Sequence, residues 1–424
     1  MSFSKLGLSP SLCLPLARLG YERPTPIQAQ AIPAVLTGTD LLARAQTGTG
    51  KTAAFGLPMI QRIVAKRDGR RPPFPHGLVL VPTRELAVQV HQSLATYGAP
   101  LQLRVTALFG GVGLGPQIQS LKHGADIVVA TPGRLIDHMQ RRTVDLSSID
   151  ILTLDEADRM LDMGFLPALR RIVASLPRTR QTLLFSATLA EAVVALAAEF
   201  TRDPARVDVS DGQVIASTVT HHLHTVAVDQ KRAMLTHVLT QDAATQALVF
   251  CKTKRGSDRV GEHLEHAGIR TAVIHGNKSQ GARTRALADF KAGRVNVLVA
   301  TDIAARGLDI VRLPLVVNYD LPLVAEDYIH RIGRTGRAGR TGRAVSFVSP
   351  SDSSLLRDIQ RLLRAPLERI AVPGFEAPTT EPLITTPEWT RVHSRDTRFI
   401  GSRRPTGRKP RHGRAQTTRP VFSR

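Results

Sequence analysis

The chain has 424 residues, 42% of them hydrophobic, so it is longer than one ordinary domain and is expected to form two or three with buried cores. Its 57 Lys and Arg against 35 Asp and Glu give a net charge of +22, which favours a polyanionic partner, nucleic acid ahead of an anionic membrane surface. The two cysteines, Cys13 and Cys251, exclude a disulfide framework and a cysteine zinc site and indicate a reducing cytoplasm, and no stretch has the length of an uncharged membrane span.

The first 38 residues are interrupted by the segment 20–28, in which Pro24 and Pro26 rule out one continuous helix. A rigid turn of this kind can hold Gln28 in a fixed pose. Because its amide both donates and accepts hydrogen bonds, Gln28 can read the edge of an adenine ring. The alternative is an ordinary start of a helix, capped by Thr25.

A short apolar strand over residues 40–45 is expected to lead into a glycine loop and then a helix. The loop is Gln46-Thr47-Gly48-Thr49-Gly50, followed by Lys51-Thr52. This order predicts a phosphate cradle, in which backbone N–H groups meet phosphate oxygens, Lys51 reaches the outer phosphates and the Thr52 hydroxyl meets Mg²⁺. The strict pattern begins with glycine where this chain has Ala45, but Gly48 and Gly50 retain the geometry.

Four apolar runs, residues 78–81, 127–129, 183–185 and 297–299, are typical of strands buried in parallel sheets, and each is followed by a hydroxyl-bearing residue. The residues after these runs include Pro82, Thr83, Arg84, Thr131, Arg134, Ser186, Thr188, Thr301 and Asp302. Each hydroxyl can cap the next helix. It can instead donate to a phosphate, because parallel strands end at one edge of their sheet and ligands bind there. The pair Gly110-Gly111 would let a backbone come close to that edge.

Another apolar run, residues 149–154, ends in three carboxylates within four residues: Asp155, Glu156 and Asp158. Alone, such a cluster is usually a solvated turn. Beside a phosphate loop it predicts acids at the ligand edge of the sheet, where nucleotide enzymes hold Mg²⁺ and a water molecule.

The pattern loosens over residues 201–217, and a second strand–helix series follows, which predicts a second α/β domain without a lysine-bearing phosphate loop. Its strands are expected at residues 224–228, 247–251, 271–274, 295–300, 315–318 and 344–348. The histidines at positions 221, 222 and 224 are a metal-binding candidate. Because they have no acidic or cysteine neighbours, we interpret them as a solvated start of a strand.

A basic segment over residues 328–340 has arginines every three positions between glycines. A solvated basic helix would avoid glycine, whereas arginine at this spacing suits bidentate contact with phosphate. If the segment faces the phosphate loop, Arg334 and Arg337 can act as arginine fingers. From residue 366 the chain lacks apolar periodicity and is expected to be a disordered, RNA-attracting tail, in which residues 391–424 hold 11 Arg or Lys and one acid, a charge of +10.

These segments occur in the order found in DEAD-box ATP-dependent RNA helicases of superfamily two, and residues 1–370 resemble that family. The tetrad Asp155-Glu156-Ala157-Asp158 gives the family its name, and Ala45 is what the family usually shows. The other matching positions are Phe3 with residues 20–28, residues 45–52, residues 82–87, Gly110 with Gly111, residues 131–134, residues 186–188, Gln280 with Arg283, residues 300–309 and residues 330–337. The short N-terminal segment and the lack of an added folded domain are most similar to the bacterial RhlE-type branch.

The resemblance implies an α/β fold of two tandem RecA-like parallel-sheet domains, with ATP and Mg²⁺ as cofactors. Phe3 would stack on adenine, Gln28 would hydrogen-bond it, and residues 45–52 would hold the phosphates, with Thr52 and Asp155 at Mg²⁺. Glu156 would orient and deprotonate the attacking water. The domains would span residues 1–38 for the adenine-reading region, 39–208, 218–365 and the tail 366–424.

In the second domain the resemblance implies that Asp309 contacts ribose, His330 bridges the domains, and Arg334 and Arg337 are the fingers. The residues implied to couple ATP to RNA are Asp158, Ser186, Thr188, Gln280 and Arg283. The residues implied to touch the RNA backbone are Pro82, Thr83, Arg84, Gly111, Thr131, Arg134, Thr301 and Asp302. Sugar and phosphate contacts carry little sequence information, so a weak sequence preference is expected.

The expected function is RNA-stimulated ATP hydrolysis coupled to closure of the two domains and local unwinding of short RNA duplexes or remodelling of RNA–protein complexes. The first alternative is an ATP-gated RNA clamp or assembly scaffold with little unwinding, and the second is a DNA helicase or translocase. We expect a cytoplasmic protein with RNA as its partner, with ribosomal or RNA-decay proteins as candidate protein partners and no membrane.

Overall fold

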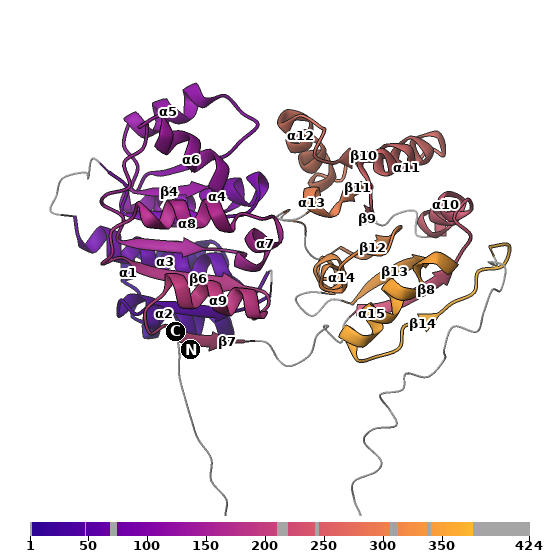
Figure 1. Cartoon of the computed structure of the whole chain (residues 1–424), viewed down its shortest axis with the longest axis horizontal. Coiled ribbons are helices and arrows are strands. Elements are labelled where there is room, and N and C mark those ends of the chain that lie inside the picture. Colours follow the sequence, from indigo (N-terminus) through magenta and orange to yellow (C-terminus); the bar gives the residue numbers. More distant parts are fainter. Residues whose placement is uncertain are drawn as a thin grey trace, which may run out of the picture. The chain divides into compact units, whose positions relative to one another are not determined.

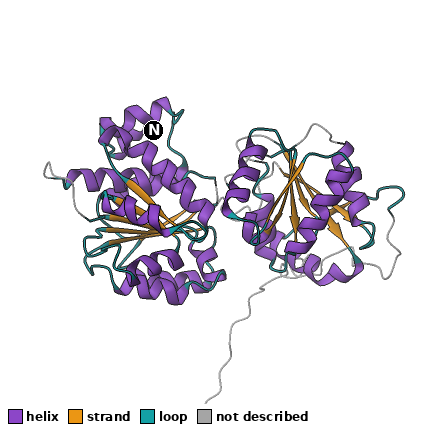
Figure 2. Ribbon diagram, turned by 90° about the horizontal axis from the view of Figure 1, so that it is seen from above, coloured by secondary structure: helices purple, strands orange, loops and turns teal. Residues whose placement is uncertain are grey.

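The computed structural model describes residues 2–46, 48–67, 74–209, 219–241, 246–305, 308, 310, 313–336 and 341–375. Three predicted site residues, Thr47, Asp309 and Arg337, and the predicted tail beyond residue 375 lie outside this described part. The described residues contain two seven-stranded sheets, which define lobe 1 (residues 2–209) and lobe 2 (residues 219–375). In each lobe, helices cover both faces of the sheet (Figure 1, Figure 2).

The lobe 1 sheet has the strand order β3-β4-β2-β5-β6-β1-β7, and all of its pairs are parallel. Parallel strands covered on both faces are apolar along their whole length, as the predicted runs are. The strands are β1 (Leu41–Arg44), β2 (Gly77–Leu80), β3 (Val105–Leu108), β4 (Ile127–Ala130), β5 (Ile151–Leu154), β6 (Gln181–Ser186) and β7 (Ala205–Asp208). The helices are η1 (Phe3–Leu6), α1 (Pro10–Arg18), α2 (Pro26–Leu36), α3 (Lys51–Ala65), α4 (Arg84–Gly98), η2 (Ala99–Leu101), α5 (Leu114–Lys122), α6 (Pro132–Gln140), α7 (Ala157–Asp162), α8 (Leu166–Ala174) and α9 (Glu191–Phe200).

The lobe 2 sheet has the order β10-β11-β9-β12-β13-β8-β14 and is also parallel throughout. Its strands are β8 (Val219–Thr225), β9 (Ala247–Cys251), β10 (Thr271–Ile274), β11 (Val297–Thr301), β12 (Leu315–Asn318), β13 (Gly342–Val348) and β14 (Glu368–Arg369). Its helices are α10 (Lys231–Gln241), α11 (Lys254–His266), α12 (Gln280–Lys291), α13 (Asp302–Ala305), α14 (Ala325–Ile332), η3 (Pro350–Asp352) and α15 (Ser353–Leu363).

The two sheets share one topology. When the strands of lobe 2 are counted from its own first strand, β8, the order becomes 3-4-2-5-6-1-7, which is the order in lobe 1. Equivalent backbone bonds follow: Ala45, after β1, donates to the carbonyl of Ser186 at 2.9 Å, and Val226, after β8, donates to Val348 at 3.0 Å. Each loop of one lobe therefore has a counterpart in the other, and the predicted fold of two tandem α/β domains is confirmed.

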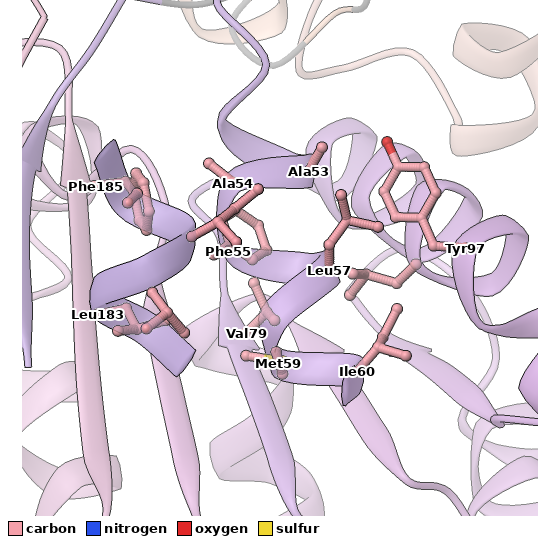
Figure 3. Close-up of a cluster of buried hydrophobic side chains, with 14 of the residues drawn as sticks. Ala53, Ala54, Phe55, Leu57, Met59, Ile60, Val79, Tyr97, Leu183 and Phe185 are labelled. Carbon is pink, nitrogen blue, oxygen red and sulfur yellow. The ribbon is translucent and has the colours of Figure 1, made fainter. Parts of the chain in front are cut away.

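The core of lobe 1 lies on both faces of its sheet. Helices α1–α4 pack on one face, and α6–α9 pack on the other. Figure 3 shows the first of these, where Phe55 and Met59 of α3 lie against Val79 and Phe185 of the sheet, with the Phe55 and Phe185 ring centroids 5.4 Å apart. Helix α3 therefore has a rigid base, and its N-terminus is held at the carboxyl edge of the strands.

Some elements differ from the sequence prediction. Strands β3 and β7 were not predicted, and β8 covers residues 219–225 rather than 224–228, so the histidines lie within the strand. They are accommodated because His221 contacts the Tyr328 hydroxyl at 3.1 Å and His224 contacts the Ile370 carbonyl at 2.8 Å. The predicted tail also begins later than residue 366, because β14 pairs with β8 and Phe375 packs on the ring of His237. Within the described residues, no helix is both long and apolar enough to cross a membrane.

Candidate functional site: a nucleotide site and a polar strand edge

The phosphate loop joins β1 to α3. Gly48 and Gly50 have φ of +84° and +94°, a left-handed backbone that glycine adopts without a steric cost. Gly50 caps α3, so Lys51 and Thr52 are the first residues of that helix. The Thr49 hydroxyl donates to the Gln46 carbonyl at 2.7 Å and closes the turn. A glycine turn running into a helix N-terminus is the geometry that binds phosphate.

The Lys51 ammonium is buried without a hydrogen-bond partner among the described residues. Lys51 is 6% exposed, and the acid next to it is Asp155, with Lys51 Nζ and Asp155 Oδ1 3.9 Å apart. That distance allows Coulomb attraction but no hydrogen bond. A buried ammonium left in this state is costly unless a ligand supplies acceptor oxygens. The phosphates of ATP would supply them, so the residues present fit this ligand.

The two acids of the site directly follow β5. Burial raises the pKa of Asp155 to about 6, against the opposing attraction of Lys51, and the negative charge of Glu156 raises it further. Glu156 is 7% exposed and has φ of +56° at the start of α7, a left-handed conformation that costs a non-glycine residue about 1–3 kcal/mol. Such strain persists where the surrounding structure fixes the backbone, and it is common at active sites.

Thr52 and Asp155 are the protein groups that would hold Mg²⁺. No cluster of three or more His, Cys, Asp or Glu suited to a metal occurs among the described residues. Mg²⁺ needs no such cluster, because it retains water and takes one or two protein ligands together with substrate phosphates. The pair fits an ion that arrives with a nucleotide.

Gln28 lies against the phosphate loop and is 1% exposed. Its side-chain oxygen accepts from the Thr25 backbone N–H at 2.9 Å, and its side-chain nitrogen donates to the Gly50 carbonyl at 3.1 Å. The amide thus ties the first turn of α2 to the loop, a bond that sequence reasoning did not anticipate. Phe3 is 5% exposed and lies edge-on to Tyr21, with ring centroids 6.3 Å apart, so its stacking on adenine stays a prediction.

Asp158 connects the acidic segment to the residues after β6. One carboxylate oxygen, Oδ2, accepts from the backbone N–H of Ala187 at 3.1 Å and of Thr188 at 3.2 Å, with the Thr188 hydroxyl at 3.5 Å. The Ser186 hydroxyl accepts from the Thr188 N–H at 3.3 Å. The structure thus brings together the three lobe 1 residues predicted to couple ATP to RNA.

The residues after β2 and β3 meet at the same edge of the lobe 1 sheet. Pro82 is buried, Thr83 caps α4 by accepting from the Leu86 N–H at 3.3 Å, and Arg84 is the first residue of that helix. The Arg84 guanidinium lies over Gly111, where an added Cβ would displace it. The φ of Gly111 is +81°, a left-handed backbone that would strain any other residue, so glycine is strongly favoured at this position.

Thr131 and Arg134 stand at the start of α6. Thr131 is 8% exposed and its N–H donates to the Leu108 carbonyl at 2.9 Å. Arg134 donates to the Val112 carbonyl at 3.1 Å, next to Gly111, and has a second guanidinium nitrogen, Nη1, that is buried without a described partner. Arg84 and Arg134 therefore hold positive charge beside the same glycine segment.

In lobe 2, Thr301 ends β11 and Asp302 begins α13. Thr301 is 7% exposed. The Asp302 carboxylate accepts two bonds from Arg331, at 2.6 Å from Nε and 2.7 Å from Nη2. Both carboxylate oxygens are thus engaged inside the lobe, and RNA contact by the Asp302 side chain remains a prediction.

His330 and Arg334 come from α14 and the turn after it. Burial holds the pKa of His330 well below its usual value, and the positive charges of Arg159, Arg334 and Lys51 lower it further, so the imidazole is neutral at pH 7. Arg334 is 6% exposed and donates to the Leu308 carbonyl at 2.6 Å. Its action as a finger on a phosphate stays a prediction.

Comparison with known proteins follows the same division of the chain. Residues 25–196 match the DEAD/DEAH box helicase family, and residues 230–339 match the helicase conserved C-terminal domain. The DEAD-box ATP-dependent RNA helicase CshA of Bacillus cereus is 41% identical over 375 residues, which cover 88% of this chain and 70% of CshA. This chain belongs to the DEAD-box helicase family.

The DEAD-box chain is also 43% identical, over 381 residues, to the ATP-dependent RNA helicase DeaD of Mycobacterium tuberculosis, covering 90% of this chain and 66% of DeaD. It thus spans slightly less than two thirds of that relative. The structure of S. cerevisiae Dbp5 bound to RNA and ADP BeF3 has a TM-score of 0.78 at 31% identity and covers 87% of this chain and 95% of that one. Both lobes of the DEAD-box chain are therefore RecA-like.

Sequence reasoning missed a partner of two predicted coupling residues of this DEAD-box protein. Gln280 and Arg283 both contact Glu85 of α4, with nitrogen–oxygen distances of 3.1 Å and 2.8 Å. Glu85 is 8% exposed and directly follows Arg84. The sequence signal that could have identified Glu85 was a carboxylate directly after Arg84, inside a basic segment that is predicted to contact RNA. Arg159, missed in the same way, pairs with Asp327 at 2.5 Å.

Sequence reasoning also missed two lobe 2 residues, Thr253 and Lys254, which are the counterparts of Thr83 and Arg84 in lobe 1. Thr253 caps α11 by accepting from the Gly256 N–H at 3.0 Å, as Thr83 caps α4. Lys254 then lies over Gly276, where an added Cβ would stand 3.4 Å from its Cε, as Arg84 lies over Gly111. The signal was the same hydroxyl residue after an apolar run, followed by a cation.

Proposed function

We propose that this chain is an ATP-dependent RNA helicase, in which RNA-stimulated ATP hydrolysis drives local unwinding of short RNA duplexes or remodelling of RNA–protein complexes. The observation that carries the proposal is the buried Lys51 ammonium, without a hydrogen-bond partner among the described residues, beside Asp155 at the end of a glycine loop. Support comes from family membership and from the similar fold of Dbp5 bound to RNA and ADP BeF3.

At the nucleotide, Gln28 would read adenine, residues 45–52 would cradle the phosphates, and Asp309 would contact ribose. Mg²⁺, held by Thr52 and Asp155, would neutralise charge on the phosphate oxygens. Lys51 would stabilise the same oxygens, and its burial makes that attraction stronger than in water.

Glu156 would orient the attacking water and accept its proton. Positioning and electrostatics supply most of the rate in phosphoryl transfer, so a strained backbone that fixes this carboxylate serves the reaction. Arg334 and Arg337 would stabilise the developing charge as fingers, and neutral His330 would bridge the lobes. Asp158 accepts a hydrogen bond from the segment after β6 and would transmit changes at Asp155 and Glu156 to the RNA edge.

For RNA we propose a backbone-reading edge on each lobe. In lobe 1 it comprises Pro82, Thr83, Arg84, Gly111, Thr131 and Arg134, and in lobe 2 it comprises Thr301 and Asp302. The shared topology adds Thr253 and Lys254, which occupy the positions of Thr83 and Arg84. Hydroxyl and cationic groups of this kind contact phosphate and sugar, so RNA would be bound with weak sequence preference.

The test is Glu156→Gln, which keeps the shape of the side chain and removes the base. RNA-stimulated ATP turnover should fall by on the order of a hundredfold or more, while ATP and RNA binding persist. Glu191→Gln, on the exposed start of α9, is the matched control and should leave turnover unchanged. Retained turnover in Glu156→Gln would contradict the role of this residue.

A strand-displacement assay separates unwinding from an ATP-gated RNA clamp. A short RNA duplex should separate faster with ATP than without it. Binding without displacement would favour the clamp or assembly scaffold. Equal stimulation of ATP turnover by DNA and RNA would favour a DNA translocase.

Several finer assignments are also proposals and rest on the sequence. They are the RhlE-type branch, a cytoplasmic location, domain limits of 1–38 and 39–208 in lobe 1, a second domain that begins at residue 218, and ribosomal or RNA-decay protein partners. The basic tail is proposed to attract RNA, because residues 391–424 carry a charge of +10. Deleting them should weaken RNA binding and flatten its salt dependence, since fewer counterions are released; an unchanged slope would contradict this role.

A further inference from the structure

Asn318 is a fully buried amide at the end of an otherwise apolar strand, β12. It lies opposite Ser346 in the register of β12 and β13, and its Nδ2 donates to the Ser346 hydroxyl at 3.1 Å. Its Oδ1 accepts from Nη1 of Arg331 at 3.0 Å. A buried amide destabilises an apolar core unless both of its ends are satisfied, and here they are.

Arg331 is the largest fully buried side chain among the described residues, at 2% exposure. Besides Asn318, it binds the Asp320 carbonyl at 2.6 Å and both oxygens of Asp302, and its guanidinium lies 4.9 Å from the Phe250 ring centre. It is thus an arginine of the basic segment that faces inward. Its role is different from that proposed for Arg334.

Tyr328, one turn before Arg331, joins α14 to strand β8. Its hydroxyl lies 3.1 Å from Nδ1 of His221 on β8, and burial raises the pKa of Tyr328 to about 12. The tyrosine is 1% exposed. Four side chains, Asp302, Arg331, Asn318 and Ser346, form one continuous hydrogen-bonded chain, which we call the polar spine.

We propose that Asn318 and Ser346 are positioning residues that hold Arg331 and thereby couple α14 to the segment Thr301–Asp302. This inference rests on the proposed function, because α14 and the turn after it carry His330 and Arg334, whereas Thr301 and Asp302 belong to the proposed RNA edge. The spine joins these two groups through the interior of lobe 2. It runs from Ser346 of β13 through Asn318 of β12 and Arg331 of α14 to Asp302, directly after β11.

The physical basis is that a buried polar chain has few arrangements in which every donor and acceptor is paired. A shift of α14 would break bonds at Asn318 or Asp302 unless the whole chain moved together. Without Asn318 or Ser346 the long Arg331 side chain can re-orient and keep its bonds to Asp302 while α14 stays in place, so binding at the RNA edge no longer biases α14. Substitutions along such networks change coupling by a factor of roughly 3 to 30.

The experiment compares Ser346→Ala with Ser349→Ala in the full chain. Both serines are 1% exposed, but the Ser349 hydroxyl donates to the Val226 carbonyl, outside the spine. Two quantities are measured: the RNA concentration that gives half-maximal ATP turnover, and hydrogen exchange of residues 297–305 and 325–332. Asn318→Ala removes the central link, and Asn318→Asp restores the acceptor for Arg331.

Ser346→Ala and Asn318→Ala should raise the half-maximal RNA concentration about tenfold and speed exchange in both segments, while turnover without RNA changes less than twofold. Ser349→Ala and Asn318→Asp should stay near wild type. Equal effects of the two serine variants, or faster exchange in only one segment, would overturn the proposal. If the wild type shows no RNA stimulation, the proposed function fails, and exchange still decides whether the spine couples the segments.

Discussion

Asp155→Asn should stabilise the nucleotide-free protein while abolishing its ATPase activity. The carboxyl is 3% exposed and its pKa is raised from 3.8 to about 6, mainly by burial. Since the folded state binds the proton more tightly than the unfolded state, ionised Asp155 opposes folding. Above pH 6 the full cost applies, and a shift of about two pKa units corresponds to about 3 kcal/mol.

Asparagine has the shape of the protonated acid and can still accept the Glu156 backbone N–H, which now lies 3.0 Å from Oδ1. At pH 8 the variant should therefore gain about 3 kcal/mol, or roughly 6–12 °C in Tm for a lobe of this size. The gain should fall to about half at pH 5 and vanish near pH 3, where Asp155 is protonated in both states. Mg²⁺-dependent ATP turnover should be lost at every pH, because the proposed metal ligand is gone.

The assay is thermal unfolding followed by circular dichroism in buffer without Mg²⁺ or nucleotide, at pH 8 and pH 5, for wild type and variant. Asp158→Asn is the control: this acid is equally buried but accepts the N–H groups of Ala187 and Thr188, so its loss should lower Tm. A lower Tm for Asp155→Asn at pH 8, or the same shift at both pH values, would refute the reasoning.

Three further predictions address other parts of the site. Gly111→Ala should weaken RNA binding about tenfold in an anisotropy titration, because the left-handed backbone strains a residue with a Cβ and the added atom would displace the Arg84 guanidinium. Gly115→Ala, with open space around it, should leave RNA binding unchanged. Gln28→Ala should raise the KM for ATP about fivefold, the value of one lost hydrogen bond to the phosphate loop, and an unchanged KM would contradict that role. In lobe 2 the buried ammonium of Lys231 lies between the carboxylates of Asp320 and Asp352. Asp352→Asn removes one of these two charges and should lower the free energy of unfolding, measured in urea, by roughly 1–3 kcal/mol; an unchanged unfolding midpoint would contradict this.

The sequence was sufficient for residues that follow an apolar strand. Parallel strands end at one edge, so a motif placed after such a run, as Lys51, Asp155 and Thr131 are, falls near the others without further information. The two-domain α/β fold followed from the same runs. The polar strand β8 was misplaced because its histidines hide the alternation that marks a strand.

Side-chain partners could not be predicted in this way. The basic segment of residues 328–340 gave no sign that Arg331 points inward to Asp302 while Arg334 binds a loop carbonyl, because spacing does not distinguish a buried arginine from a ligand-facing one. The bond from Gln28 to Gly50 was hidden for a similar reason: a capping glutamine and an adenine-reading glutamine share the same sequence position. Tertiary packing decides these cases.

The repeated topology shows what distinguishes a nucleotide site from a structural ion cluster. Lys51 begins the helix after the first strand of lobe 1, and Lys231 begins the helix after the first strand of lobe 2. Both lysines are buried, with exposures of 6% and 5%. The Nζ atom of Lys51 lies 3.9 Å from Asp155, and that of Lys231 lies 3.6 Å from Asp320. Both aspartates stand just after the fifth strand of their lobe. In lobe 2 the carboxylate of Asp352, 3.4 Å away, supplies a second anion. In lobe 1 no described side chain supplies a second anion to Lys51, and the glycine loop leaves room there for a phosphate. The same position of the fold is therefore suited to bind a ligand in lobe 1, whereas in lobe 2 two carboxylates of the chain already neutralise the ammonium.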